Sequence, residues 1–84
     1  MSIAPPKPVL DEITDFLITR PLPEEVIAYR LPDALEQRAH ALMERHRQNA
    51  LTPPERAEME EFMQADHLMT LLKAKARLKL VGKE

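Results

Sequence analysis

The longest uninterrupted stretch of helix-favouring sequence lies between Thr52 and Gly82. After the prolines at 53 and 54 it contains no further proline, and its first glycine is Gly82. Thr52 can cap the first turn of a helix, with Glu55 three residues later to complete a capping box. The sequence therefore predicts a single helix over about 53–81, which would be roughly 42 Å long at 1.5 Å per residue.

Prolines divide the rest of the chain into shorter periodic segments. The chain has 84 residues and eight prolines, and a proline breaks a helix interior but suits a helix start. Three shorter helices are predicted, over about 8–19, 23–29 and 32–49. Because only the short "NAL" separates the last of these from the long helix, the two should form an antiparallel hairpin. We expect one all-α domain over 1–84, with residues 1–7 loose.

Two apolar stripes run along the predicted long helix, and the helix over 32–49, about 26 Å long, can cover only one of them. The main stripe consists of Phe62, Ala65, Leu68, Met69, Leu72, Ala76 and Leu80. The second, weaker stripe consists of Met59, Met63, Leu71, Ala74 and Leu78. Coverage of the second stripe needs the two N-terminal helices, another subunit or a different protein. The predicted partner interface is Phe62, Ala65, Leu68, Met69, Leu71, Leu72, Ala76, Leu78 and Leu80.

Basic residues alternate with apolar ones near the end of the chain. In a helix, steps of two residues place Lys73 and Arg77 on one flank of the main stripe, and Lys75 and Lys79 on the other. Charges that flank an apolar stripe are typical of helix–helix interfaces, whereas a nucleic-acid surface gathers its charge on one face. The net charge of −2 also gives no general attraction to nucleic acid.

Residues for catalysis or metal binding are sparse. There is no cysteine, which excludes thiol chemistry and disulfides. Helix-bundle di-iron sites place a glutamate three residues before a histidine. Here Gln64 occupies that position before His67, and Glu36 stands four residues before His40. His46 continues the apolar stripe of 32–49 and is predicted to be partly buried. We expect no metal, no cofactor and no enzymatic activity.

No membrane-directed segment is apparent in the sequence. The longest apolar runs are too short to span a bilayer. The stretch "MSIAPPKPVL" also lacks the apolar core of a signal peptide. The sequence therefore predicts a cytoplasmic protein that makes no membrane contact.

Two segments resemble a group of short, uncharacterised bacterial helical proteins. They are "LDEITDFLITRPLPEEVIAYRLP" and "LTPPERAEMEEFMQADHLMTLLKAKARLKL", which match a pattern of "PEE", "LTPEE" and "HLM-LLKA-AR". The chain departs from that pattern at Leu22 and Leu31, where a serine-like cap is expected, and at Pro54, where glutamate is usual. The resemblance implies a small helical fold without catalytic residues. It also implies an antitoxin-like protein or an accessory subunit of a neighbouring gene's product.

These observations predict a non-catalytic protein-interaction module that self-associates through the apolar stripes of its long helix. The first alternative is an antitoxin-like or accessory subunit that binds an unrelated enzyme. The second alternative is a nucleic-acid binder that uses the basic end of the long helix. The partner is expected to be a protein, either a second copy in a homo-oligomer or the product of a neighbouring gene.

Overall fold

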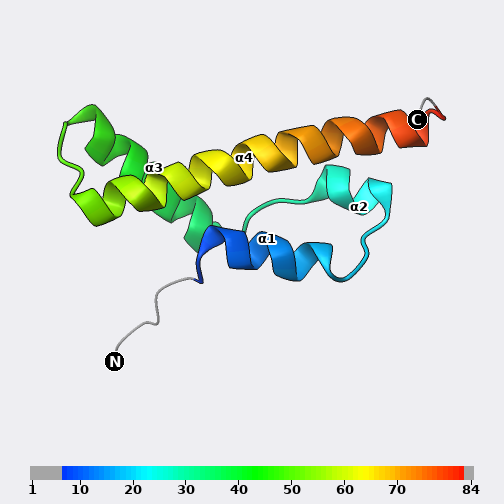
Figure 1. The fold of residues 1–84 in the computed structure, drawn as a ribbon, viewed down its shortest axis with the longest axis horizontal. Helices are drawn as coiled ribbons and strands as arrows, with labels where there is room; N and C mark the ends of the chain where they lie inside the picture. The colour runs from blue at the N-terminus through cyan, green and yellow to red at the C-terminus, as the bar shows by residue number, and fades with distance from the viewer. Residues whose placement is uncertain (1–6, 83–84) are drawn as a thin grey trace.

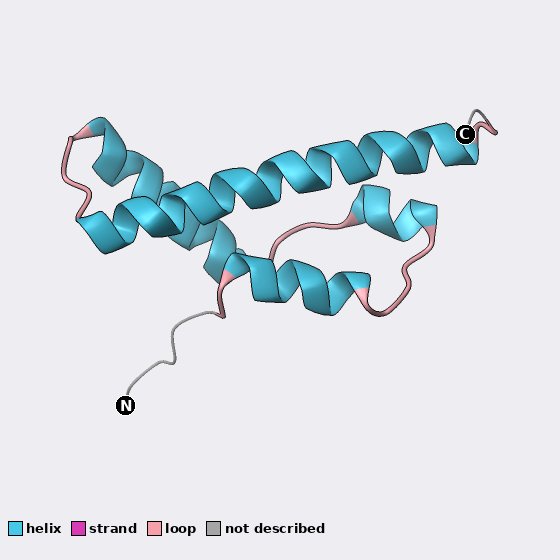
Figure 2. Cartoon of the chain, in the orientation of Figure 1, coloured by secondary structure: helices cyan, strands magenta, loops and turns pink. Residues whose placement is uncertain are grey.

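The computed structural model describes residues 7–82, and within that range the chain is helical with no strand (Figure 2). Each helix lies within about two residues of its predicted bounds. The prediction that residues 1–7 are loose falls mostly on residues 1–6, which lie outside the described range. The helices are α1 (Val9–Leu17), α2 (Pro23–Ala28), α3 (Asp33–Arg47) and α4 (Pro53–Leu80).

Proline fixes the start of every helix, but in two different ways. Pro23 and Pro53 are the first residues of α2 and α4, where a missing N–H costs nothing because first-turn N–H groups have no partner within the helix. Pro8 and Pro32 stand one residue before α1 and α3, at the N-cap, with ψ near 150°. The two kinds of position explain why the predicted starts at 8 and 32 are one residue early.

The turn between α3 and α4 is set by Asn49, which has a left-handed φ of 55°. The N–H of Ala50 donates to the carbonyl of Arg45 at 2.8 Å, and the N–H of Asn49 donates to that of His46 at 3.0 Å. This pair of bonds is the Schellman arrangement, which ends a helix and reverses the chain. α4 begins only a few residues later.

The long helix α4 is the element against which the other three helices pack (Figure 1). α1 runs below its middle, α2 returns beneath its C-terminal half, and α3 crosses its N-terminal part instead of lying along it. The principal-axis extents are 46 × 31 × 16 Å, and the radius of gyration is 15.0 Å. A compact globule of this length would have a radius of gyration of about 12 Å. The chain is therefore flat and elongated.

The core forms where α1 and α2 pack against α4. It is built from Val9 and Ile13 of α1, Val26 of α2, and Ala65, Met69 and Ala76 of α4. α3 contributes two further buried side chains, Leu35 and Leu42. The main burial partner of the C-terminal half of α4 is therefore the N-terminal part of the same chain.

One expectation for α3 is wrong. His46 was predicted to be partly buried at the edge of the core, but it is exposed. The apolar stripe of α3 leaves the core after Leu42, and the last turn of α3 meets the start of α4 through a polar contact, the ion pair of Arg45 with Glu55. No helix formed by residues 7–82 has the length and apolar character that a bilayer crossing requires.

Candidate protein-interaction surface

The main stripe of α4 divides into a covered part and an exposed part. The covered side chains face α1 and α2 and are buried or half-buried; they are Phe62, Ala65, Met69, Leu72 and Ala76. Leu68 and Leu80 are exposed. Leu68 lies at the edge of the stripe and Leu80 lies near the end of α4. Five of the nine predicted interface residues are thus used by the chain's own core.

The second stripe, unlike the covered part of the main stripe, is largely exposed. Only its first member, Met59, is half-buried, and the rest of the stripe faces solvent. Met63 is 61 % exposed, Leu71 48 % and Leu78 49 %. Val81, 65 % exposed, continues the same line beyond the last helical residue. We call this surface the outer face of α4 and define it as Met63, His67, Leu71, Ala74, Leu78 and Val81.

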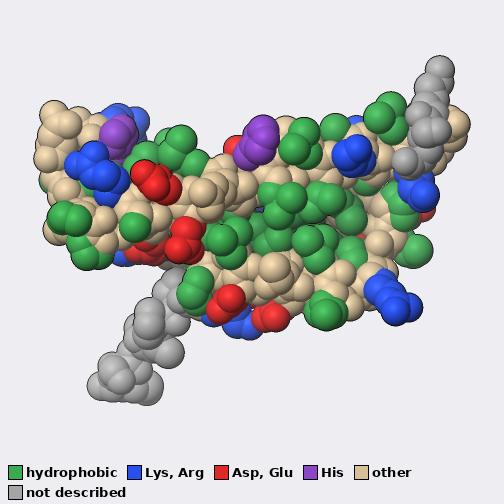
Figure 3. Space-filling view, in the orientation of Figure 1, with side chains coloured by type: hydrophobic (Ala, Val, Ile, Leu, Met, Phe, Trp, Pro, Cys, Tyr) green, Lys and Arg blue, Asp and Glu red, His purple; other side chains and the backbone are tan. Residues whose placement is uncertain are grey.

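The outer face lies on the far side of α4 from the core. At about 100° per residue, its six members fall within an arc of about 80°, centred about 180° from the covered part of the main stripe. Glu55 and Glu58, which pair with α3, lie on the core side as well. All three other helices therefore pack against one side of α4. In the space-filling view, hydrophobic side chains stand along its free upper edge (Figure 3).

An exposed apolar stripe on an otherwise charged helix is unusual. Single exposed apolar side chains are normal on protein surfaces, but a contiguous row of them indicates a contact surface. The spacing here is 4, 4, 3, 4 and 3 residues, which keeps the row straight along the helix. Such a row has the spacing of a helix-packing surface.

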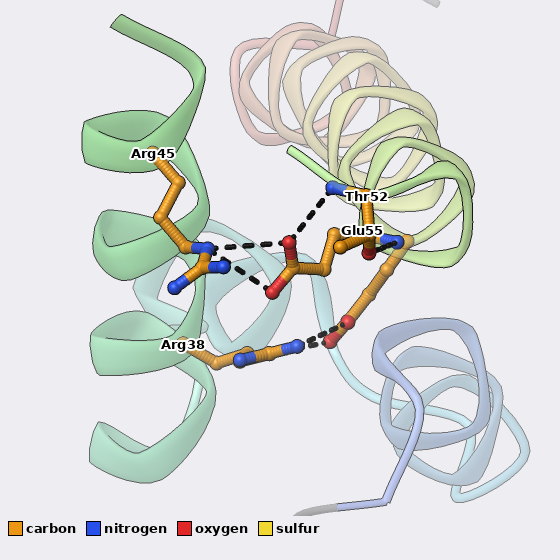
Figure 4. Close-up of polar contacts among 5 residues, drawn as sticks. Arg38, Arg45, Thr52 and Glu55 are labelled. Atoms are coloured by element: carbon orange, nitrogen blue, oxygen red, sulfur yellow. Dashed lines mark hydrogen bonds and ion pairs between the residues drawn. The ribbon is translucent and has the colours of Figure 1, made fainter. Parts of the chain in front are cut away.

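Polar contacts fix α3 against the start of α4 (Figure 4). Arg38 donates two hydrogen bonds to the carboxylate of Glu58, at 2.7 and 2.9 Å. Arg45 pairs with Glu55 at 3.1 Å. Glu55 also closes the predicted capping box: it accepts from the N–H of Thr52 at 3.0 Å, and its own N–H donates to the Thr52 hydroxyl at 3.3 Å.

These contacts shift the titration of the carboxyl groups. Hydrogen bonds from the Arg38 guanidinium lower the pKa of Glu58, although partial burial opposes the shift. The N–H of Thr52, followed by the nearby charge of Arg45, lowers the pKa of Glu55. Charge-assisted hydrogen bonds of this kind favour the ionised carboxylate. Both acids therefore stabilise the α3–α4 junction.

The four basic residues near the end of α4 do not form one face. Lys73 is half-buried, and its ammonium donates to the main-chain carbonyl of Tyr29 at 2.9 Å. Lys75 and Lys79 lie on one flank of the outer face, and Arg77 lies on the other. The positive charge is therefore divided, with Lys73 engaged inside the fold.

Two shallow grooves flank the core, with volumes of about 280 and 320 Å³. The larger lies between α4 and the segment that follows α2, and its lining includes Ile13, Tyr29, Met69 and Lys73. The Tyr29 hydroxyl is buried there and has no hydrogen-bond partner among residues 7–82. In the same part of the chain, no cluster of three or more histidine and acidic side chains is arranged to hold a metal ion.

Sequence reasoning missed the interactions that join distant segments. The bond from Lys73 to Tyr29 spans 44 residues, and the pair of Arg38 with Glu58 spans 20. No local sequence pattern predicts either of these two interactions. Val81 was also missed, although it lies within the helix predicted over 53–81 and its spacing from Leu78 continues the second stripe.

No protein family, no curated protein and no solved structure matches this chain. The resemblance to short bacterial helical proteins therefore stays a prediction.

Proposed function

We propose that this chain is a non-catalytic protein-interaction module that binds a helix of another polypeptide on the outer face of α4. The single observation behind this proposal is the position of Leu71, Leu78 and Val81. These apolar side chains are about half exposed or more, and they lie on one line on the side of α4 that none of the other three helices uses. Burial of such a row against a second helix removes apolar area from water, at about 25 cal/mol per Å².

Adjacent leucines on α4 provide a matched test. Leu71 belongs to the outer face, whereas Leu72 packs against the core cluster. Leu71→Asp should leave the fold intact, since an exposed helix position tolerates aspartate at a cost of a few tenths of a kcal/mol or somewhat more. Leu72→Asp should destabilise the fold strongly, because it places a carboxylate in an apolar environment.

The assay compares association by these two variants and the wild type. The size of the purified chain is measured by light scattering, and complexes are sought by co-expression with the products of neighbouring genes. Leu71→Asp should abolish the assembly that the wild type forms while its circular dichroism remains that of a helical protein. If Leu71→Asp assembles as the wild type does in every combination, the proposal is overturned. It is also overturned if the chain's only assembly is with DNA and is lost in Lys75→Gln/Lys79→Gln.

A further inference from the structure

The outer face of α4 has a symmetry in its spacing that points to one kind of partner. Leu71 lies near its centre, and the two positions on either side of it correspond in pairs, whereas Val81 has no counterpart within the face. Met63 is eight residues before Leu71 and Leu78 is seven after; His67 is four before and Ala74 is three after. A second copy of the same face, reversed in direction, would bring Leu71 to Leu71 and Met63 to Leu78. Both of these contacts are apolar, and His67 would meet Ala74.

Charge along α4 favours the reversed direction. Its first half holds Glu60, Glu61 and Asp66, and its second half is basic. A parallel, in-register pair would place each end beside an end of like charge, which is unfavourable. An antiparallel pair places the acidic half of each copy beside the basic half of the other.

The flanking residues agree with the same register. Asp66 and Arg77 lie on one flank of the outer face, five residues before Leu71 and six after it. In a two-fold antiparallel pair, equivalent flanks of the two helices face each other. In such a pair Asp66 would face Arg77 of the second copy at nearly the same height, within about one residue rise of 1.5 Å.

No helix formed by residues 7–82 obstructs this approach. α1, α2 and α3 all pack on the core side of α4, and the outer face is open from Met63 to Val81. We propose that the partner is a second copy of this chain, bound antiparallel through α4 with the two-fold axis beside Leu71. This inference rests on the proposed function and specifies its partner and geometry.

Cysteine cross-linking tests the geometry directly, since the chain has no cysteine of its own. A disulfide requires Cα atoms about 4.4–6.8 Å apart. Leu71→Cys places two thiols beside the axis, and mild oxidation should link the copies. Leu78→Cys should not link, because its two copies would be about 21 Å apart along the helices. Met43→Cys on α3, similarly exposed, controls for random collision.

The double variant Met63→Cys/Leu78→Cys tests a pair of positions that the proposed dimer brings together. The two thiols within one chain are about 22 Å apart on the same helix, so they cannot bridge internally. Across the proposed interface they are adjacent, and the double variant should form a linked dimer that neither single variant forms. Linkage of Leu78→Cys alone, or equal linkage of Leu71→Cys and Met43→Cys, overturns the antiparallel pairing.

A charge exchange gives a second, non-covalent readout. Asp66→Arg or Arg77→Asp alone should weaken dimerisation roughly two- to thirtyfold, the range for exposed charge pairs counted twice by symmetry. The double exchange should restore it. If the wild type is monomeric while Leu71→Asp still destroys a complex with a neighbouring gene's product, this inference falls and the proposed function stands. If Leu71→Asp affects no assembly at all, both fall.

Discussion

Lys73 of α4 donates a hydrogen bond of 2.9 Å to the main-chain carbonyl of Tyr29, the C-cap residue that follows α2. Carbonyls at a helix C-terminus lack partners within the helix and hold partial negative charge. The ammonium satisfies one of them and joins α2 to α4. Lys73, which the sequence groups with the other basic residues near the end of α4, therefore has a structural role.

Removal of the Lys73 ammonium should destabilise the fold. Lys73→Gln is expected to lower the free energy of unfolding by about 1 kcal/mol, the usual size of one lost hydrogen bond. The same change at the exposed Lys75 is the matched control and should have little effect. Urea unfolding followed by circular dichroism measures both. Equal stability of the two variants would show that the hydrogen bond from Lys73 to Tyr29 contributes nothing to the free energy of unfolding.

The capping box at the start of α4 should respond to loss of its hydroxyl. Thr52→Ala removes the acceptor of the N–H of Glu55 and should cost about 1 kcal/mol. For a domain of this size, that corresponds to a fall in melting temperature of about 4–8 °C. Thr52→Ser retains the hydroxyl and should melt close to the wild type. A Thr52→Ala protein that melts at the wild-type temperature would contradict the capping role.

Acid should weaken the junction between α3 and α4. The pKa of Glu58 in the fold is below its ordinary value of 4.5, chiefly through Arg38. A group with a lowered pKa stabilises the fold above its unfolded pKa, and that contribution disappears as the pH falls through the folded pKa. Glu58→Gln should therefore melt below the wild type at pH 7, and the difference should narrow below about pH 4.5.

Glu60→Gln is the control for this titration, since Glu60 is exposed and holds no ion pair among residues 7–82. Its melting temperature should follow that of the wild type across the same pH range. A Glu58→Gln deficit that stays constant down to pH 3 would mean that the effect is not electrostatic.

The hydroxyl of Tyr29 offers a substitution that should not destabilise the protein. Its ring packs against Phe16 with centroids 4.3 Å apart, but the buried hydroxyl has no partner within the described chain. Burial also raises the pKa of Tyr29. Tyr29→Phe keeps the ring contact, removes an unsatisfied polar group and should be neutral or stabilising. Tyr29→Leu removes the ring pair as well and should melt lower. A clearly destabilised Tyr29→Phe would reveal a polar partner for the hydroxyl.

Local signals were enough to predict the helices and the first residues of α2 and α4. Thr52 and Glu55 predicted the start of α4 because a capping box involves only residues three apart. Pro23 and Pro53 predicted the first residues of α2 and α4, because the preference of proline for the first helical position is also a local effect. The predicted ends near 19 and 49 extended too far, since the left-handed residues Arg20 and Asn49 follow turns whose geometry the residue types alone do not specify.

The sequence by itself determined that α4 is one long helix with two apolar stripes, because helical periodicity decides which residues share a face. It did not determine which stripe the chain covers. That depends on where α1 and α2 pack, and their position is set by contacts between distant segments, such as Ile13 with the core residues of α4 and Lys73 with Tyr29. Only the tertiary structure placed Leu72 inside and left its neighbour Leu71 exposed. Adjacent helical residues point about 100° apart, and all three other helices approach α4 from one side.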